Sequence, residues 1–137
     1  MFGKYLGTNC ADSAQKDLVT VALKAIGNIG DFAKIDILDK CATTKENSMQ
    51  IRVSAVESLR KFSYEKISVL DGITNGIMKN SEEDTELRIS AFLVLVKGIQ
   101  SEKYQEICVK YFTTMIENEN DYQVIYNMNS WLILCII

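Results

Sequence analysis

The chain has 137 residues, of which 47% are apolar and 24% are charged, and this balance suits one globular domain. Its net charge is −3 and it carries no basic tract, so nucleic acid is not an expected partner. It has no histidine, which excludes Ser-His-Asp and Cys-His catalysis and the common zinc sites, and no proline, which favours long helices.

The two ends of the chain resemble the interior of a longer protein. Phe2, Tyr5 and Leu6 predict an apolar helical face, and no apolar run near them is long enough for a signal peptide. The C-terminal WLILCII is too short to span a bilayer. We therefore expect residues 1–137 to form a single partial domain of a larger protein, with 131–137 as an off-pattern tail.

A helical pattern recurs four times along the chain. The copies are LVTVALKAIG, IRVSAVESLR, LRISAFLVLV and YQVIYNMNSW, which begin at Leu18, Ile51, Leu87 and Tyr122, at offsets of 33, 36 and 35 residues. The two middle copies share an arginine, a small alanine and a leucine. We assign these as structural repeat positions: Arg52, Ala55 and Leu59, then Arg88, Ala91 and Leu95.

Each copy is followed by a second apolar pattern of helical period, after a polar turn. These second helices are expected in AKIDILDKCA (Ala33–Ala42), YEKISVLDGITNGIMK (Tyr64–Lys79) and SEKYQEICVKYFTTMIENE (Ser101–Glu119). Stacked helix pairs at a period of about 33–36 residues predict an all-α fold, a HEAT-like α-solenoid of about seven helices. The long helices should have roughly 11–17 residues.

The third copy is apolar on more than one side. Between Ile89 and Val96 only Ser90 is polar, so we expect this helix to be covered by several neighbours. Ser81 is expected to be its N-cap. The acidic run Glu82-Glu83-Asp84 is then expected to lie at the positive end of the helix dipole; a metal or partner site is the alternative.

The repeat arginines and the four cysteines each allow two interpretations. Arg52 and Arg88 are expected to bond carbonyls or an acidic partner in the adjacent turn, with an anion or lipid headgroup site as the alternative. Cys10, Cys41, Cys108 and Cys135 lack the CxxC spacing of redox and zinc motifs. We expect buried, unpaired thiols; disulfides are the alternative for a secreted protein, and the spacing selects no pairing.

Three stretches of the chain resemble one protein family. LKAIGNIGD (Leu23–Asp31) is similar to the helix-ending Gly-Asn-x-Gly stretch of the large lipid transfer proteins. ELRISAFLVLVKGIQSEKYQEI (Glu86–Ile107) and ENENDYQVIYNMNSWL (Glu117–Leu132) resemble two later elements, although the family's Pro-Ser turn is replaced by Ile99-Gln100-Ser101. The family comprises vitellogenin, apolipophorin, apolipoprotein B and the microsomal triglyceride transfer protein.

This resemblance implies a secreted lipid transport or storage lipoprotein, in which the chain forms part of a helical wall around a lipid cavity. The partners would be lipid, bound by the full-length protein, and other domains of that protein. The lipid-contacting residues are unassigned. An intracellular HEAT-like interaction scaffold is the alternative. No residue is nominated as catalytic, metal-binding or cofactor-binding, and we expect the isolated chain to self-associate.

Overall fold

The computed structural model describes residues 6–7, 10, 15–62, 76–99 and 105–136, and all regular structure in these ranges is helical. The all-α prediction is confirmed. The α-helices are α2 (Lys16–Ile29), α3 (Ile35–Thr43), α4 (Met49–Ser58), α6 (Thr85–Ile99), α7 (Gln105–Asn118) and α8 (Tyr122–Ile136). Two 3-10 helices, η1 (Phe32–Lys34) and η2 (Leu59–Lys61), adjoin α3 and α4. Most of the helix predicted for 64–79 lies outside the described residues.

The chain divides into two compact units, Met1–Lys66 and Ile67–Ile137, and each is described by itself. The single-domain organisation stays a prediction. Helices α2, α6, α7 and α8 have 14 or 15 residues, within the predicted range. Helices α3 and α4 are shorter, at 9 and 10 residues. The second of these ends early because the chain tightens into η2, a common ending for an α-helix.

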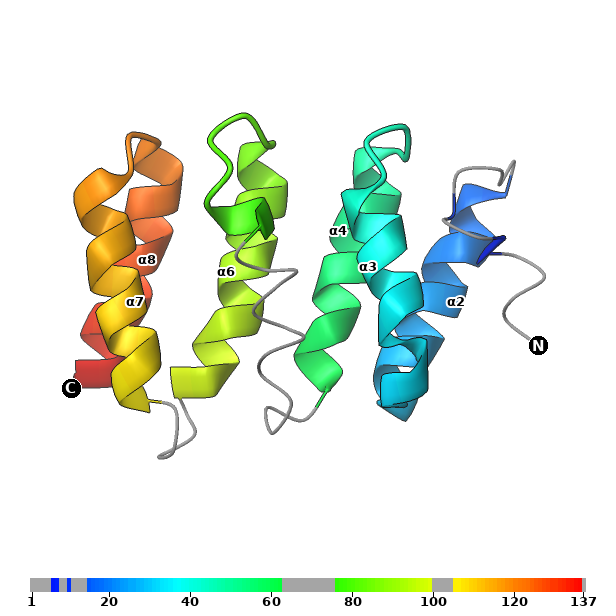
Figure 1. The fold of residues 1–137 in the computed structure, drawn as a ribbon, viewed down its shortest axis with the longest axis horizontal. Coiled ribbons are helices and arrows are strands. Elements are labelled where there is room, and N and C mark those ends of the chain that lie inside the picture. The colour runs from blue at the N-terminus through cyan, green and yellow to red at the C-terminus, as the bar shows by residue number, and fades with distance from the viewer. Residues whose placement is uncertain (1–5, 8–9, 11–14, 63–75, 100–104, 137) are drawn as a thin grey trace. The chain divides into compact units, whose positions relative to one another are not determined.

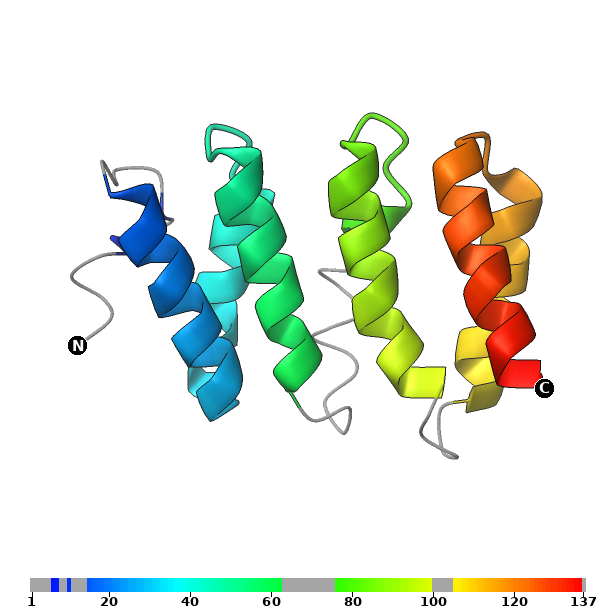
Figure 2. The ribbon, with the colours of Figure 1, turned by 180° about the vertical axis from the view of Figure 1, so that it is seen from behind.

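In the first unit, α2 and α4 lie side by side and α3 packs against α4 from the other layer (Figures 1 and 2). The apolar residues of α2 explain this arrangement because Val19, Leu23 and Ile26 recur at helical spacing and are all buried. Fully burying a side chain of this size stabilises the fold by about 1.5–3 kcal/mol. The burial of these three side chains is therefore the main reason that α2 stays packed against α4.

Two glycines shape the end of α2. A Cβ atom on Gly27 would lie only 2.7 Å from the backbone oxygen of Ser58, so only glycine allows α2 to approach the end of α4 this closely. Gly30 follows the helix with φ of 68°, a left-handed conformation that glycine adopts without steric cost, and its amide bonds to the Ile26 carbonyl. The first glycine therefore sets the packing distance, and the second ends the helix.

In the second unit, α6 and α8 form one layer and α7 packs against both (Figures 1 and 2). Phe92 of α6 meets Phe112 of α7 edge to face, with ring centroids 5.0 Å apart, and both rings are fully buried. Val94, Leu95 and Val96 are buried as well, whereas two other apolar residues of α6, Ile89 and Leu93, are only half-buried. Helix α6 is thus covered on most of its circumference.

Helices α2, α4, α6 and α8 begin with equivalent hydrogen bonds, each from the amide four residues after the cap to the cap carbonyl. The caps are Gln15, Ser48, Asp84 and Asp121. The fourth helix is therefore 37 residues after the third, and the predicted offset of 35 is wrong. Ser81 is also not the N-cap, because Asp84 holds that place and its carboxylate accepts from the Glu86 amide at 2.8 Å.

Candidate functional site

The two repeat arginines make the same contact in their respective units. Arg52, 5% exposed, donates from Nε to the Ala42 carbonyl at 2.7 Å. Arg88, 3% exposed, donates from Nε to the Met78 carbonyl at 3.1 Å, again ten residues earlier in the chain. Both carbonyls lie at the end of the preceding helix, where no intrahelical donor remains. Each arginine thus closes the C-terminus of the helix before it.

Arg88 has a second partner that sequence reasoning did not single out. Its Nη2 donates to Oε2 of Glu119, in the turn between α7 and α8. The other oxygen, Oε1, accepts from the amides of Asn120 and Asp121 at 3.0 and 2.9 Å. The acidic ENEND turn was the only sequence signal, and nothing in that signal distinguishes Glu119 from its acidic neighbour Glu117.

Asp121 joins the start of α8 to the start of α6. Its carboxylate accepts a 2.5 Å hydrogen bond from the Thr85 hydroxyl and two more from the amides of Gln123 and Val124. The Thr85 bond is the main cause that lowers the pKa of Asp121, since it stabilises the charged form. In the first unit, partial burial raises the pKa of Asp39, and the nearby Asp36 carboxylate adds to this effect.

A groove of about 660 Å³ opens beside these groups in the second unit. Its lining brings together the end of α7, the following turn and the segment before α6: Lys79, Ser81, Arg88, Thr114, Met115, Asn118, Glu119, Asn120 and Asp121. Positive and negative side chains both line it, and Glu119 and Asp121 are already engaged in the bonds described above. The groove is therefore lined by both charges in equal number, and its two carboxylates are already bonded within the protein.

The remaining repeat positions lie in the cores of the two units. Ala55 and Leu59 are fully buried in the first unit, and Ala91 and Leu95 are buried in the second. A small side chain in the middle of a helix lets a neighbouring helix come close. These positions serve packing, and the structure gives none of them a chemical role.

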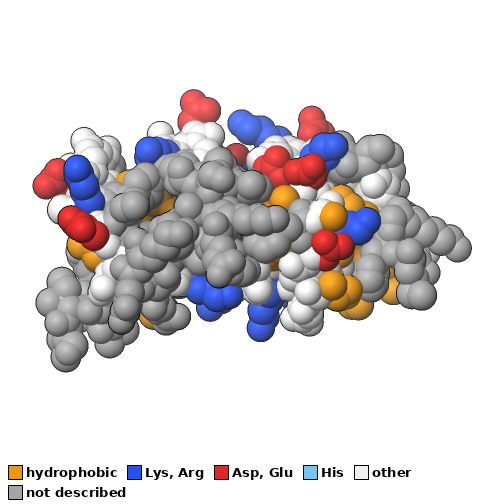
Figure 3. All heavy atoms as spheres, turned by 60° about the horizontal axis from the view of Figure 1, so that its bottom comes forward, with side chains coloured by type: hydrophobic (Ala, Val, Ile, Leu, Met, Phe, Trp, Pro, Cys, Tyr) orange, Lys and Arg blue, Asp and Glu red, His pale blue; other side chains and the backbone are white. Residues whose placement is uncertain are grey.

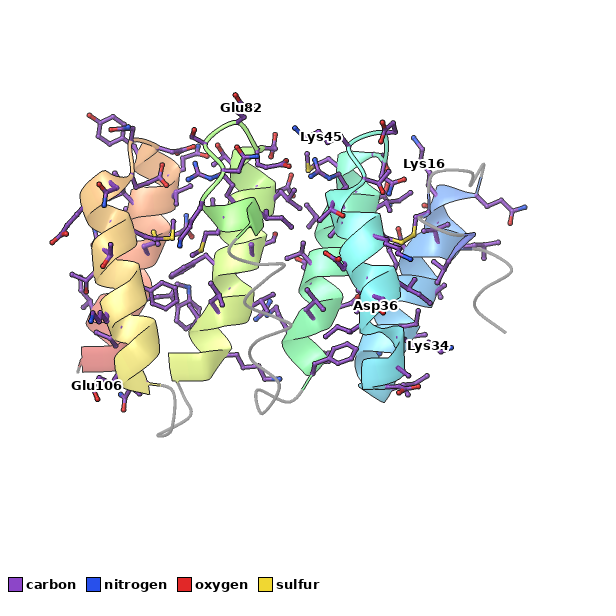
Figure 4. The ribbon with its side chains drawn as sticks, viewed as in Figure 1. Lys16, Lys34, Asp36, Lys45, Glu82 and Glu106 are labelled. Atoms are coloured by element: carbon purple, nitrogen blue, oxygen red, sulfur yellow. A yellow bond between two sulfur atoms is a disulfide. The ribbon has the colours of Figure 1, made fainter. Side chains whose placement is uncertain are left out.

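The expectation of unpaired thiols is wrong for two of the cysteines. Cys10 and Cys41 form a disulfide, with their Cα atoms 5.3 Å apart, and both are almost wholly buried (Figure 4). The bond ties the segment before α2 to α3 across 31 residues of sequence. The spacing of cysteines could not identify this pair, because the pairing depends on how α2 and α3 fold back on each other. The side chains of Cys108 and Cys135 lie outside the described residues.

Helices α2 and α8, one in each unit, leave apolar side chains in solvent. On α2, Leu18, Val21 and Ile29 are 45%, 63% and 66% exposed. On α8, Tyr122, Tyr126 and Ile133 are 85%, 74% and 58% exposed. In each helix the three residues are spaced by multiples of about one turn, so each set forms one stripe. We call them the α2 stripe and the α8 stripe.

Charge on the described surface is mixed. On the face shown in Figure 3, acidic and basic side chains are interspersed, with apolar patches between them. In the part of the chain that the structure describes, no three His, Cys, Asp or Glu side chains form a group that could hold a metal ion. None of the described helices has the length and apolar character needed to cross a bilayer.

Comparison with known protein families shows to which family this chain belongs. A sequence model of the vitellogenin TPR domain matches residues 3–128. The chain belongs to the vitellogenin TPR domain family. This domain is the helical domain of the large lipid transfer proteins, so the resemblance seen in the sequence is confirmed, and family membership connects the chain with lipid transport. No curated protein and no solved structure matches it.

Proposed function

We propose that this chain is part of the helical wall of a secreted lipid transport or storage protein, similar to vitellogenin and apolipophorin. The observation that carries the proposal is the family match over residues 3–128. In such a protein the chain catalyses nothing. It contributes a rigid helical layer, and other domains of the same protein enclose the apolar cavity that removes lipid from water.

Two features of the structure support this role. The buried Cys10–Cys41 disulfide suits an oxidising compartment such as the secretory pathway, since cytosolic thiols are kept reduced. The α2 stripe exposes Leu18, Val21 and Ile29 on one line, a surface typical of a helix that packs against another domain. We assign that surface to the cavity-lining part of the parent protein.

The test uses the full-length parent protein, secreted from a cell line and purified under mild conditions. The lipid bound per protein is measured by mass spectrometry after extraction, for the wild type and for Val21→Glu. We expect lipid in the wild type and several-fold less in the variant, because a carboxylate on the stripe opposes docking of an apolar domain.

Lys16→Glu is the matched control, since Lys16 is exposed on the same helix but, two residues before Leu18, lies on the side opposite to the stripe. It should leave the lipid content unchanged. A secreted, folded parent protein that carries no lipid would overturn the lipid-transport function itself. Normal lipid content in Val21→Glu would overturn only the assignment of the α2 stripe to the wall contact.

A further inference from the structure

The turn before α6 presents one serine in an unusual state. Ser81 lies at the tip of the turn, which is closed by a 3.1 Å bond from the Glu83 amide to the Asn80 carbonyl. The Asn80 side chain tightens it further by accepting from the Glu82 amide at 3.0 Å. Ser81 is exposed, and its hydroxyl makes no hydrogen bond to any described residue.

The other described serines and threonines are different. The exposed threonines each donate their hydroxyl to a carbonyl four residues earlier: Thr43, Thr113 and Thr114. Ser54, Ser58 and Ser90 are buried. Among the serines and threonines of the described ranges, Ser81 is therefore the residue that is both exposed and not hydrogen-bonded to a described residue, so its oxygen is open to a reagent from solvent.

The residues that follow Ser81 are all acidic. Glu82, Glu83 and Asp84 occupy the next three positions, and Glu82 extends outward from the turn before α6 (Figure 4). Enzymes that select a substrate by its charge use a complementary surface, and three successive carboxylates fit a basic substrate groove. The equivalent turn of the preceding repeat, 36 residues earlier, places Lys45 where Ser81 lies and has a single acidic residue after it.

We propose that Ser81 is a phosphorylation site for an acid-directed serine kinase that uses ATP. The Ser81 oxygen attacks the γ-phosphorus, and the new O–P bond forms as the bond to the bridging oxygen of ADP breaks. ADP leaves with the electron pair, and a base of the kinase takes the hydroxyl proton. The product carries about 1.5–2 additional negative charges at neutral pH.

The groove beside the turn accommodates the added charge. Ser81 lines it together with Lys79, whose ammonium group offsets part of the repulsion from the neighbouring carboxylates. The modification therefore changes the surface charge of the turn without requiring α6 to unfold. It does not depend on the proposed role in lipid transport.

The experiment incubates the purified chain with an acid-directed serine kinase and labelled ATP, and locates the phosphate by peptide mass spectrometry. A synthetic peptide covering residues 76–90 shows that the kinase is active. We expect close to one phosphate per chain, on Ser81, with none on the Ser81→Ala variant. Substituting both Glu82→Gln and Glu83→Gln should lower kcat/KM at least about tenfold, which corresponds to the loss of one good charge interaction.

The preceding repeat supplies a matched control. In a Ser81→Ala background, Lys45→Ser presents a serine at the same place in an equivalent turn that lacks the acidic run, and it should be modified at least about tenfold more slowly. Circular dichroism checks that each variant is folded. Phosphorylation of the peptide but not of the folded chain, or equal rates at the two turns, would overturn the proposal.

Discussion

Arg88 and Glu119 form an ion pair between the first turns of α6 and the turn after α7, and their side chains are only 4% and 6% exposed. The two residues are 31 positions apart in sequence. Both charges are almost fully removed from water. The pair therefore adds little net stability, but the loss of one partner alone is costly because it leaves the other charge buried.

Glu119→Gln should therefore be strongly destabilising. It removes the carboxylate that pairs with the buried Arg88 guanidinium, and we expect the free energy of unfolding in urea to fall by about 3–5 kcal/mol. Glu117→Gln removes the same kind of charge from an exposed position at the end of α7 and should change the free energy of unfolding by less than about 0.5 kcal/mol. Equal effects of the two substitutions would contradict the importance of the pair.

The hydrogen bond from Thr85 to Asp121 should appear in the pH dependence of stability. The pKa of Asp121 is lower in the folded chain than in the unfolded chain, where it is near 3.8. The folded state thus binds this proton less readily, so the contribution is present above that pH and is lost as the pH falls through the folded pKa.

Thr85→Val removes the main cause of the shift, and the unfolding midpoint of this variant should fall less steeply with acid than that of the wild type. Midpoints measured from pH 7 to pH 2 test this. Thr113→Val, which removes a hydroxyl bonded to the Val109 carbonyl of its own helix, should leave the wild-type slope intact. Identical slopes for Thr85→Val and the wild type would show that the bond does not form in solution.

Gly27→Ala tests the close approach of α2 to the end of α4. The new methyl group would meet Ser58 at 2.7–2.9 Å, and two of the three nearest atoms belong to the backbone, which cannot rotate away. We expect a loss of about 1–3 kcal/mol in unfolding free energy. Gly76→Ala is the control, because its Cβ would meet no described atom within 4 Å; a loss as large as that at Gly27 would point to a general effect of alanine.

Reduction of the Cys10–Cys41 disulfide should destabilise the first unit. Opening a loop of 31 residues restores conformational freedom to the unfolded chain, which corresponds to about 3–4 kcal/mol. Thermal melts with and without a reductant should differ by several degrees for the wild type. The double variant Cys10→Ser with Cys41→Ser should melt like the reduced wild type and ignore the reductant; a remaining response would implicate other cysteines.

The apolar stripes lead us to expect self-association of the isolated chain. Light scattering after size exclusion should give a mass above that of the monomer, increasing with concentration. Val21→Glu combined with Ile29→Glu should shift the mass toward the monomer, because both residues are more than 60% exposed on the α2 stripe. A wild-type chain that stays monomeric at all concentrations would contradict this expectation.

Sequence reasoning succeeded where local periodicity carries the information. The all-α class, the helix pairs and the shared arginine position all follow from spacing along single helices, and Arg52 and Arg88 indeed lie in equivalent surroundings. The offset of the fourth repeat was wrong because its apolar residues fit two registers. The cap decides between them, since Asp121 rather than an apolar residue aligns with Asp84.

The remaining features could not be predicted because they depend on distant parts of the chain. Which cysteine meets Cys10 depends on the return of the chain through α3. Which acid meets Arg88 depends on the path after α7, and the sequence offers Glu117 and Glu119 equally. Hydrophobic periodicity indicates which face of a helix is buried, but it does not indicate which loop packs beside that helix.

The bonds from the repeat arginines to preceding helices also bear on how this chain can be divided. The Ala42 carbonyl, in the last turn of α3, accepts a hydrogen bond from Arg52 in the next repeat, so a helix pair excised at the intervening turn would lose this bond. During synthesis, α3 likewise leaves the ribosome before Arg52, which bonds to its C-terminus. In chimeras and deletions, the boundary should therefore follow the helix that carries the arginine. The helix before each arginine then keeps the residue that bonds to its C-terminus.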